Sequence, residues 1–154
     1  MKQLFQQPNN LKRVVTAPMF LWLVVVLIAA PLAASADAER VLGIWKTQPN
    51  DEGSYLHVEI HACENKLCGT ILNAFRKGDE LIEDYENKGK KMIWDMSLKS
   101  GTDLPSWGKG RIWAPDNDKT YKSGMVLNGG TLKVTGCIPI GWPCRTQTWS
   151  VVIP

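Results

Sequence analysis

The stretch Tyr55–Leu72, YLHVEIHACENKLCGTIL, decides how the rest of the chain is interpreted. Two runs rich in β-branched residues flank the polar segment ENK at residues 64–66, which is typical of two strands joined by a tight turn. In the first run apolar and polar residues alternate, the apolar set being Leu56, Val58, Ile60 and Ala62. The pattern predicts a β-hairpin with one buried face and one solvated face.

The solvated face of this hairpin carries His57, Glu59 and His61. Two residues four apart on a straight strand lie about 13 Å apart. A zinc ion holds its nitrogen ligands at about 2.0–2.1 Å, so the two histidines cannot share one ion, and no metal site is predicted. Glu59 and His61 remain the only candidates in the hairpin for hydrolase-like chemistry.

Residues 1–36 have the order of segments found in a secretory signal. Basic residues come first, then an apolar run, then small residues: Lys2, Lys12 and Arg13, Val14 to Ala30, and Ala34-Ser35-Ala36. This order predicts a signal helix cleaved after Ala36, which leaves residues 37–154 as one domain in the periplasm or secreted. The alternative is an uncleaved anchor, since residues 14–34 are long enough to span a bilayer, although Pro18 and Pro31 interrupt them.

The basic residues of this segment account for the net charge of +3. Residues 37–154 hold equal numbers of acidic and basic side chains. A neutral domain has no overall electrostatic attraction to nucleic acid or to anionic lipid. We therefore expect a monomer that binds neither nucleic acid nor, once the signal is removed, a membrane.

All four cysteines lie in the predicted mature domain, where an oxidising compartment preserves disulfides. Of the three possible pairings, the local one is favoured, Cys63–Cys68 and Cys137–Cys144, because each pair brackets a short segment rich in turn-forming residues. Loops this short contribute about 2–2.5 kcal/mol each in the chain-entropy model.

Helical periodicity is nearly absent from residues 37–154, and short β-branched or aromatic runs alternate with turn residues. Eight strands are predicted: Val41–Thr47, Ser54–Ala62, Cys68–Phe75, Met92–Ser97, Gly110–Ala114, Lys119–Leu127, Thr131–Gly136 and Arg145–Ile153. Hairpin turns at ENK, APDND (114–118) and NGG (128–130) join several of them. The expected fold is an all-β, antiparallel, up-and-down barrel of about eight strands. At this strand number the interior is filled by side chains or holds one small ligand.

Two connections are longer than hairpin turns. Arg76–Lys91 is a charged loop, and Ile138–Pro143 is an apolar loop enclosed by the predicted Cys137–Cys144 disulfide. Such an apolar loop suits either a plug at the barrel end or a contact with another molecule.

The motif GIW at Gly43–Trp45 is similar to the G-x-W that opens the first strand of lipocalin-like barrels. In those folds the Trp packs at the closed end of the barrel beneath an Arg from the last strand. The resemblance implies structural roles for Gly43 and Trp45, with Arg145 as the partner of Trp45.

The chain also resembles the DUF2147 family of exported bacterial proteins, which has no established activity. The matching pieces are GIW, HVEI followed by C-x4-C-G (Cys63–Gly69), WGKGRIWAPDNDKTY (107–121), GC (136–137) and CRTQTW (144–149). The chain departs from the family between Asp84 and Leu98, where Asp84 and Asn87 keep only part of an Asp-x-x-Asn pattern. The resemblance implies an exported barrel and supplies no catalytic residues.

Tryptophans are unusually frequent. We expect Trp45, Trp113 and Trp149 to belong to the barrel core. The candidates for ligand binding or interaction are Trp94, Trp107, Tyr121, Ile140 and Trp142.

Three functions follow as hypotheses. The first is an exported, non-enzymatic barrel without a cofactor that binds a small apolar or amphipathic ligand in the bacterial envelope, by analogy of fold. The second is a protein-interaction or inhibitor module that uses the Ile138–Pro143 loop against an envelope protein. The third is a hydrolase-like enzyme that uses Glu59 and His61.

Overall fold

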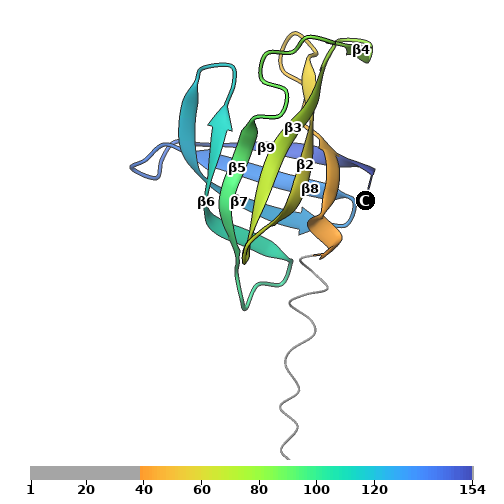
Figure 1. Ribbon diagram of the computed structural model, residues 1–154. Helices are drawn as coiled ribbons and strands as arrows, with labels where there is room; N and C mark the ends of the chain where they lie inside the picture. Colours follow the sequence, from red (N-terminus) through yellow and green to blue (C-terminus); the bar gives the residue numbers. More distant parts are fainter. Residues whose placement is uncertain (1–38, 154) are drawn as a thin grey trace, which may run out of the picture. The chain divides into compact units, whose positions relative to one another are not determined.

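The computed structural model describes residues 39–153, which form a β-barrel (Figure 1). After a helical turn at residues 39–41 come β1 Gly43–Lys46, β2 Tyr55–Cys63, β3 Lys66–Arg76, β4 Glu80–Leu81, β5 Lys91–Leu98, β6 Ser106–Ala114, β7 Lys119–Asn128, β8 Thr131–Cys137 and β9 Cys144–Ile153. None of the helical structure in residues 39–153 is long and apolar enough to cross a membrane. The predicted signal, residues 1–36, lies outside the described residues.

Eight of the strands close into a barrel. The sheet order is β2-β1-β9-β8-β7-β6-β5-β3-β4, and the additional pairing of β2 with β3 joins the two sides. Every paired strand is antiparallel to its neighbour, and β4 is attached only to β3. The predicted up-and-down barrel is confirmed, and closure pairs the sheet edges that would otherwise be open.

The opening hairpin forms as its sequence indicates. β2 and β3 pair from Tyr55↔Phe75 to Cys63↔Lys66, with a bulge next to His57. Val58 and Ile60 are fully buried, whereas Ala62, close to the turn, is exposed. In the turn, Glu64 has a positive φ of 57°. The disulfide Cys63–Cys68 spans the end of the hairpin.

Most strand boundaries differ from the prediction by one or two residues, and two differences are larger. β6 begins at Ser106 rather than Gly110, because Trp107 already pairs with Leu98 of β5 and Met125 of β7. The two-residue β4 lies inside the charged loop and is too short to produce an alternating pattern.

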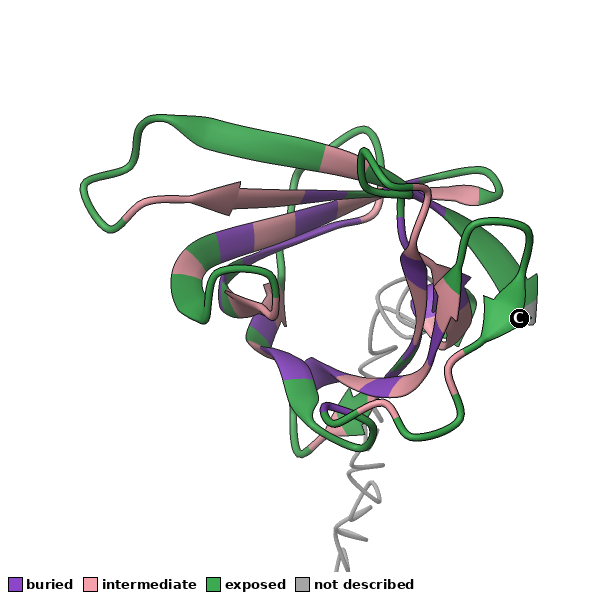
Figure 2. Cartoon of the chain, turned by 90° about the horizontal axis from the view of Figure 1, so that it is seen from above, coloured by how far each residue is buried: buried purple, intermediate pink, exposed green. Residues whose placement is uncertain are grey.

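Large side chains fill one half of the barrel. Three tryptophans with at most 2% of their surface exposed form its centre, Trp45, Trp107 and Trp149, and Ile60, Leu67, Met96, Met125, Leu127 and Leu132 surround them. Burial follows the strand pleat, so buried and exposed residues alternate along the barrel wall in Figure 2. Trp113, expected in the core, is only half-buried at its edge and donates its indole N–H to Asp118.

The expected pairing of Trp45 with Arg145 is wrong. Trp45 pairs with Val151 on β9 and donates its indole N–H to the Val41 carbonyl at 2.9 Å. Arg145 lies six residues before Val151, about 20 Å along an extended strand. The first strand therefore meets the end of β9 and not its beginning. Gly43 adopts a φ of 129°, a conformation that favours glycine.

Candidate functional site: a cavity in the open half of the barrel

The other half of the barrel is hollow. A cavity of about 690 Å³ opens where β1 ends, β2 begins, β6 ends and β9 begins. Its lining residues are Thr47–Asn50, Ser54–Leu56, Ala74, Phe75, Ile82, Tyr85–Asn87, Met92, Ile112, Ala114–Asn117, Tyr121, Val134, Gly136, Ile138, Pro143–Arg145 and Gln147. This volume lies within the range of about 300–1,000 Å³ that is typical of ligand pockets.

The wall of the cavity is apolar. Leu56, Met92, Ile112 and Val134 line it from β2, β5, β6 and β8. Three small residues enlarge the space, Ala74, Ala114 and Gly136. A Cβ atom at Gly136 would lie 3.3 Å from Ile112 and 3.5 Å from Tyr121, so a larger residue there would press on both walls. Small inward residues therefore keep this half open.

Polar groups surround the mouth of the cavity. Tyr121 accepts a hydrogen bond from the amide of Asn117 at 2.9 Å, and Gln48 accepts one from the backbone N–H of Thr148 at 3.0 Å. These bonds connect the β6–β7 turn to β7, and the end of β1 to β9. Arg145 adds a guanidinium at the rim, where it is exposed. An apolar wall beneath a polar rim matches a ligand that has one apolar end and one polar end.

The charged loop between β3 and β5 forms one side of the mouth. Its backbone is attached to β3 by hydrogen bonds from Ile82 N–H to the Ala74 carbonyl and from Gly89 N–H to the Ile71 carbonyl. Asn87 is buried within the loop and accepts a hydrogen bond from the Lys90 ammonium at 2.5 Å. Asp84, the other residue of the partial family pattern, is exposed. Asn87 thus has a structural position at the cavity, which the sequence reasoning did not predict.

A polar and aromatic cluster covers the adjacent ends of β1, β2 and β3. Tyr55 stacks on Phe75, with ring centroids 4.9 Å apart, and its hydroxyl donates to Asp79 at 2.5 Å. The ammonium of Lys46 lies 3.7 Å from the Tyr55 ring centroid and 3.3 Å from the Asp79 carboxylate. This cluster holds the β3–β4 turn against the barrel, next to the cavity.

The same cluster shifts three protonation equilibria. Burial raises the pKa of the Tyr55 phenol, and its hydrogen bond to Asp79 acts in the same direction. The hydrogen bond from Tyr55, followed by that from Lys46, lowers the pKa of Asp79. Burial lowers the pKa of His57, and the positive charge of Lys46 adds to that effect. His57 is therefore held in its neutral form more strongly than an exposed histidine.

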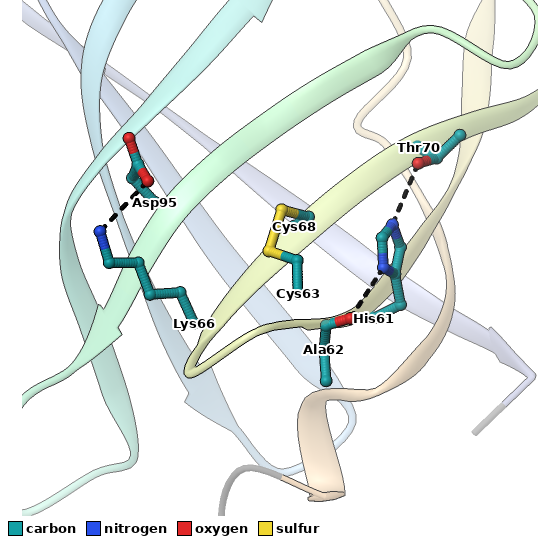
Figure 3. The surroundings of a disulfide bond; sticks show 7 residues. All are labelled: His61, Ala62, Cys63, Lys66, Cys68, Thr70 and Asp95. Carbon is teal, nitrogen blue, oxygen red and sulfur yellow. Dashed lines mark hydrogen bonds and ion pairs between the residues drawn. A yellow bond between two sulfur atoms is a disulfide. The ribbon is translucent and has the colours of Figure 1, made fainter.

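The catalytic candidates Glu59 and His61 lie outside the cavity. Glu59 is exposed, and the ring of His61 contacts the hydroxyl of Thr70 at 3.1 Å and the carbonyl of Ala62 at 3.2 Å, beside the Cys63–Cys68 disulfide (Figure 3). Within residues 39–153, no three His, Cys, Asp or Glu side chains gather as metal ligands would. The geometry gives the hydrolase hypothesis no cleft at this place.

The five candidate binding residues lie in four different environments. Tyr121 lines the cavity, while Trp107 belongs to the filled half with 1% of its surface exposed. Trp94 is half-buried on β5 and does not line the cavity. Ile140 and Trp142 are 88% and 77% exposed at the tip of the β8–β9 loop. The ends of that loop, Ile138 and Pro143, do line the mouth.

Both disulfides have the local pairing expected from the sequence. Cys63–Cys68 and Cys137–Cys144 have S–S distances of 2.05 and 2.04 Å, and no free cysteine occurs among the described residues. Two disulfides in a small domain indicate an extracytoplasmic protein. One disulfide lies at the filled end of the barrel and the other at the cavity mouth.

A family comparison covers the barrel and the residues of both cysteine pairs. The family model described as "Uncharacterized protein conserved in bacteria (DUF2147)" matches residues 43–151, which include all nine strands except the last residues of β9. The chain belongs to this family. No curated protein matches the sequence significantly.

A solved structure has a similar architecture. It is a protein from the human pathogen Helicobacter pylori, described as belonging to the lipocalin family. It superposes with a TM-score of 0.54 at 18% sequence identity, covering 72% of this chain and 82% of that one. At this identity the similarity establishes a shared fold. The lipocalin-like barrel predicted for this DUF2147 member is therefore confirmed.

Proposed function

We propose that this protein is an exported, non-enzymatic barrel that binds a small amphipathic molecule in the bacterial envelope. The observation that carries the proposal is the cavity of about 690 Å³ in the open half. Its apolar wall of Leu56, Met92, Ile112 and Val134 suits an acyl chain or a comparable hydrocarbon group. The polar rim with Arg145 suits the head of such a molecule.

The position of the cavity within the barrel supports binding over catalysis. The two residues with hydrolase-like potential in the hairpin, Glu59 and His61, do not line it. Among the residues that line it, the Tyr55 phenol has a pKa that burial raises, and its hydrogen bond to Asp79 acts in the same direction. A raised tyrosine pKa keeps the phenol protonated, which suits a hydrogen-bond donor better than a base.

Native mass spectrometry tests the proposal. Protein purified with both disulfides formed should carry, or take up from an added lipid extract, one noncovalent molecule per barrel, and organic extraction should release it for identification. A barrel that stays empty in the presence of long-chain fatty acids, lysophospholipids and apolar dyes would contradict ligand binding. Reducing the disulfides without unfolding the barrel provides a second sample with an altered mouth.

A second candidate, a protein-interaction or inhibitor module, is favoured by the exposure of Ile140 and Trp142. It requires a partner protein that the loop captures. If this function is correct, Trp142→Ala abolishes capture of that partner and leaves the melting temperature unchanged. Capture that does not depend on Trp142 would contradict the module.

A further inference from the structure

The β8–β9 loop presents an unusual apolar surface. Ile140 and Trp142 are 88% and 77% exposed. No other large hydrophobic residue in the described part of the chain is as exposed. The Cys137–Cys144 disulfide closes the loop, and a hydrogen bond from Gly141 N–H to the Ile138 carbonyl at 2.8 Å forms its turn. In both Figures 1 and 2 the loop projects beyond the barrel wall. The disulfide-closed loop therefore holds two large apolar side chains in water, where they add nothing to the packing of the core.

Cationic side chains lie beside this loop on the outer barrel face. A shallow concavity of about 350 Å³ is lined by Lys99, Lys109 and Lys122 together with Cys137 at the end of β8 and Gly141 of the loop. Within residues 39–153, none of these three lysines has a carboxylate oxygen within 4.0 Å. The apolar tip and the unpaired lysines therefore form one continuous surface, here called the loop–lysine surface: Lys99, Lys109, Lys122, Ile140 and Trp142.

Charge is distributed unevenly around the barrel. Strands β6, β7, β8 and β9 contain no Asp or Glu, while Arg111 and Lys133 add to the lysines on the exposed side of β6 and β8. The loop between β3 and β5 carries five carboxylates, Asp79, Glu80, Glu83, Asp84 and Glu86, against three lysines, Lys77, Lys88 and Lys90. A domain that is neutral in sum therefore has one cationic side. The expectation of no attraction to membranes came from the net charge of the domain, and a net charge does not reveal a cationic side.

We propose that the loop–lysine surface docks the barrel onto an anionic lipid bilayer. This inference rests on the proposed binding function, since docking would bring the cavity mouth to the source of an amphipathic ligand. Trp is favoured at the membrane–water interface, and lysines are attracted by anionic headgroups. Two such weak signals together give stable but reversible attachment.

The location of the loop links docking to the cavity. Its ends, Ile138 and Pro143, line the mouth, and its tip carries the exposed Ile140 and Trp142. A tip inserted at the headgroup level therefore places the mouth next to the bilayer. A ligand can then pass between lipid and cavity with little exposure of its apolar part to water.

The surface fits a bilayer better than a protein partner. Stable protein interfaces bury an area of about 1,200 Å² or more, and lysine is depleted from them. Here two apolar side chains at a narrow tip are flanked by lysines. This arrangement corresponds to an interfacial anchor with cationic neighbours.

Quenching by brominated lipids tests insertion of the loop. The exported form of the chain, with the predicted signal removed and both disulfides formed, is mixed with vesicles of phosphatidylglycerol and phosphatidylcholine that carry bromine on their acyl chains. Trp45, Trp107 and Trp149 are at most 2% exposed inside the barrel and should escape quenching. Comparison with Trp142→Phe isolates Trp142, since both proteins share every other tryptophan.

We expect strong quenching of the Trp142 contribution by anionic vesicles and little by pure phosphatidylcholine. The quenched fraction should fall markedly in Trp142→Phe. Equal quenched fractions in the two proteins would overturn the proposal, and would leave a protein partner as the reason for the exposed loop.

Three lysine substitutions test the electrostatic part. The variant Lys99→Gln/Lys109→Gln/Lys122→Gln should bind anionic vesicles more weakly, as measured by Trp142 quenching. The loss of affinity should be about fivefold for each lysine that contacts the membrane. The matched control is Lys77→Gln/Lys88→Gln/Lys91→Gln, which removes the same charge from exposed positions in the acidic region. An equal loss in both triple variants would contradict a specific docking face.

One further variant separates docking from ligand binding. Ala114→Phe places a ring in the cavity, far along the chain from the loop tip, and should leave Trp142 quenching unchanged. If anionic vesicles quench Trp142 but the wild-type barrel binds no ligand, the proposed function is wrong and membrane docking is supported. If the barrel binds a ligand but Trp142 is not quenched, membrane docking is wrong and the proposed function is supported.

Discussion

The two halves of the barrel share eight strands and differ in what points inward. In the filled half the inward residues include Trp45, Trp107 and Trp149, which leave no room for a ligand. In the open half they include Ala74, Ala114 and Gly136, and a cavity of about 690 Å³ remains. An eight-stranded barrel is only just wide enough for either outcome. Inward residue size, and not strand number, therefore decides where this barrel is hollow.

The difference also divides stability from binding. The filled half has the close packing that gives a small domain its free energy of folding. In the open half Leu56, Tyr85 and Ile112 are only partly buried, and ligand binding would bury them further. Substitutions in the two halves should therefore have different consequences.

The largest expected effect is in the filled half. Trp107→Ala should lower the free energy of unfolding by about 3–5 kcal/mol, because it creates an enclosed void. Tyr121→Ala, at the wall of the existing cavity, should cost less than about 2 kcal/mol. Urea denaturation of both variants checks the pair. Equal losses would mean that the two halves are packed alike.

The two disulfides provide the next comparison. Cys63→Ser/Cys68→Ser and Cys137→Ser/Cys144→Ser should each lower the free energy of unfolding by about 2 kcal/mol, because the closed loops have similar lengths. Only the second pair should weaken ligand binding, since Cys144 lines the cavity. Denaturation and ligand titration of the two double variants measure both effects. A loss of ligand affinity in the first variant would contradict the division between the halves.

A smaller effect concerns pH. Because the folded state lowers the pKa of His57, the unfolded chain takes up the proton first as pH falls below the ordinary value of 6.5. The free energy of unfolding should therefore decrease through that window. The charged and ring groups that face His57 or act on it are Lys46, Tyr55, Phe75 and Asp79.

His57→Gln checks this assignment. In this variant, the decrease in the free energy of unfolding that begins near pH 6.5 should be absent. The variant should keep the further loss at more acidic pH, where Asp79, whose pKa is lowered from 3.8, becomes protonated. An unchanged pH profile measured by thermal denaturation would mean that another group titrates in this window.

The smallest effect is expected on the outer wall. Glu59→Gln/His61→Ala should change the free energy of unfolding by no more than about 0.5 kcal/mol and should leave ligand affinity unchanged, because neither residue lines the cavity. Loss of ligand binding in this double variant would contradict the location of the site.

Alternation and turn residues were enough to predict the barrel. The hairpin Tyr55–Leu72, the Asn-Gly turn after Leu127 and the local disulfides all depend on neighbours in the sequence, and the structure has each of them. Arg145 could not be placed in this way, because its position relative to Trp45 depends on the register between the first and last strands.

The site was predicted only in part for a similar reason. Tyr121 was identified, whereas Trp107 was grouped with it although it lies in the filled half. Aromatic identity does not reveal at which height of the barrel a residue lies. The small residues Ala114 and Gly136, which make the cavity, give no signal in composition. In the sequence, only the position of these small residues next to a strand end, on the inward side, could have indicated the cavity.

Binding in the open half is tested most directly by titrating the apolar fluorescent dye N-phenyl-1-naphthylamine into two matched variants. Ala114→Phe places a ring inside the cavity, and Thr120→Phe places the same ring at an exposed position beside the inward-facing Tyr121. The account predicts that the wild type and Thr120→Phe bind the dye alike, while Ala114→Phe binds it at least about tenfold more weakly, a difference of about 1.4 kcal/mol. Equal affinity in all three proteins, with the fold intact, would contradict it.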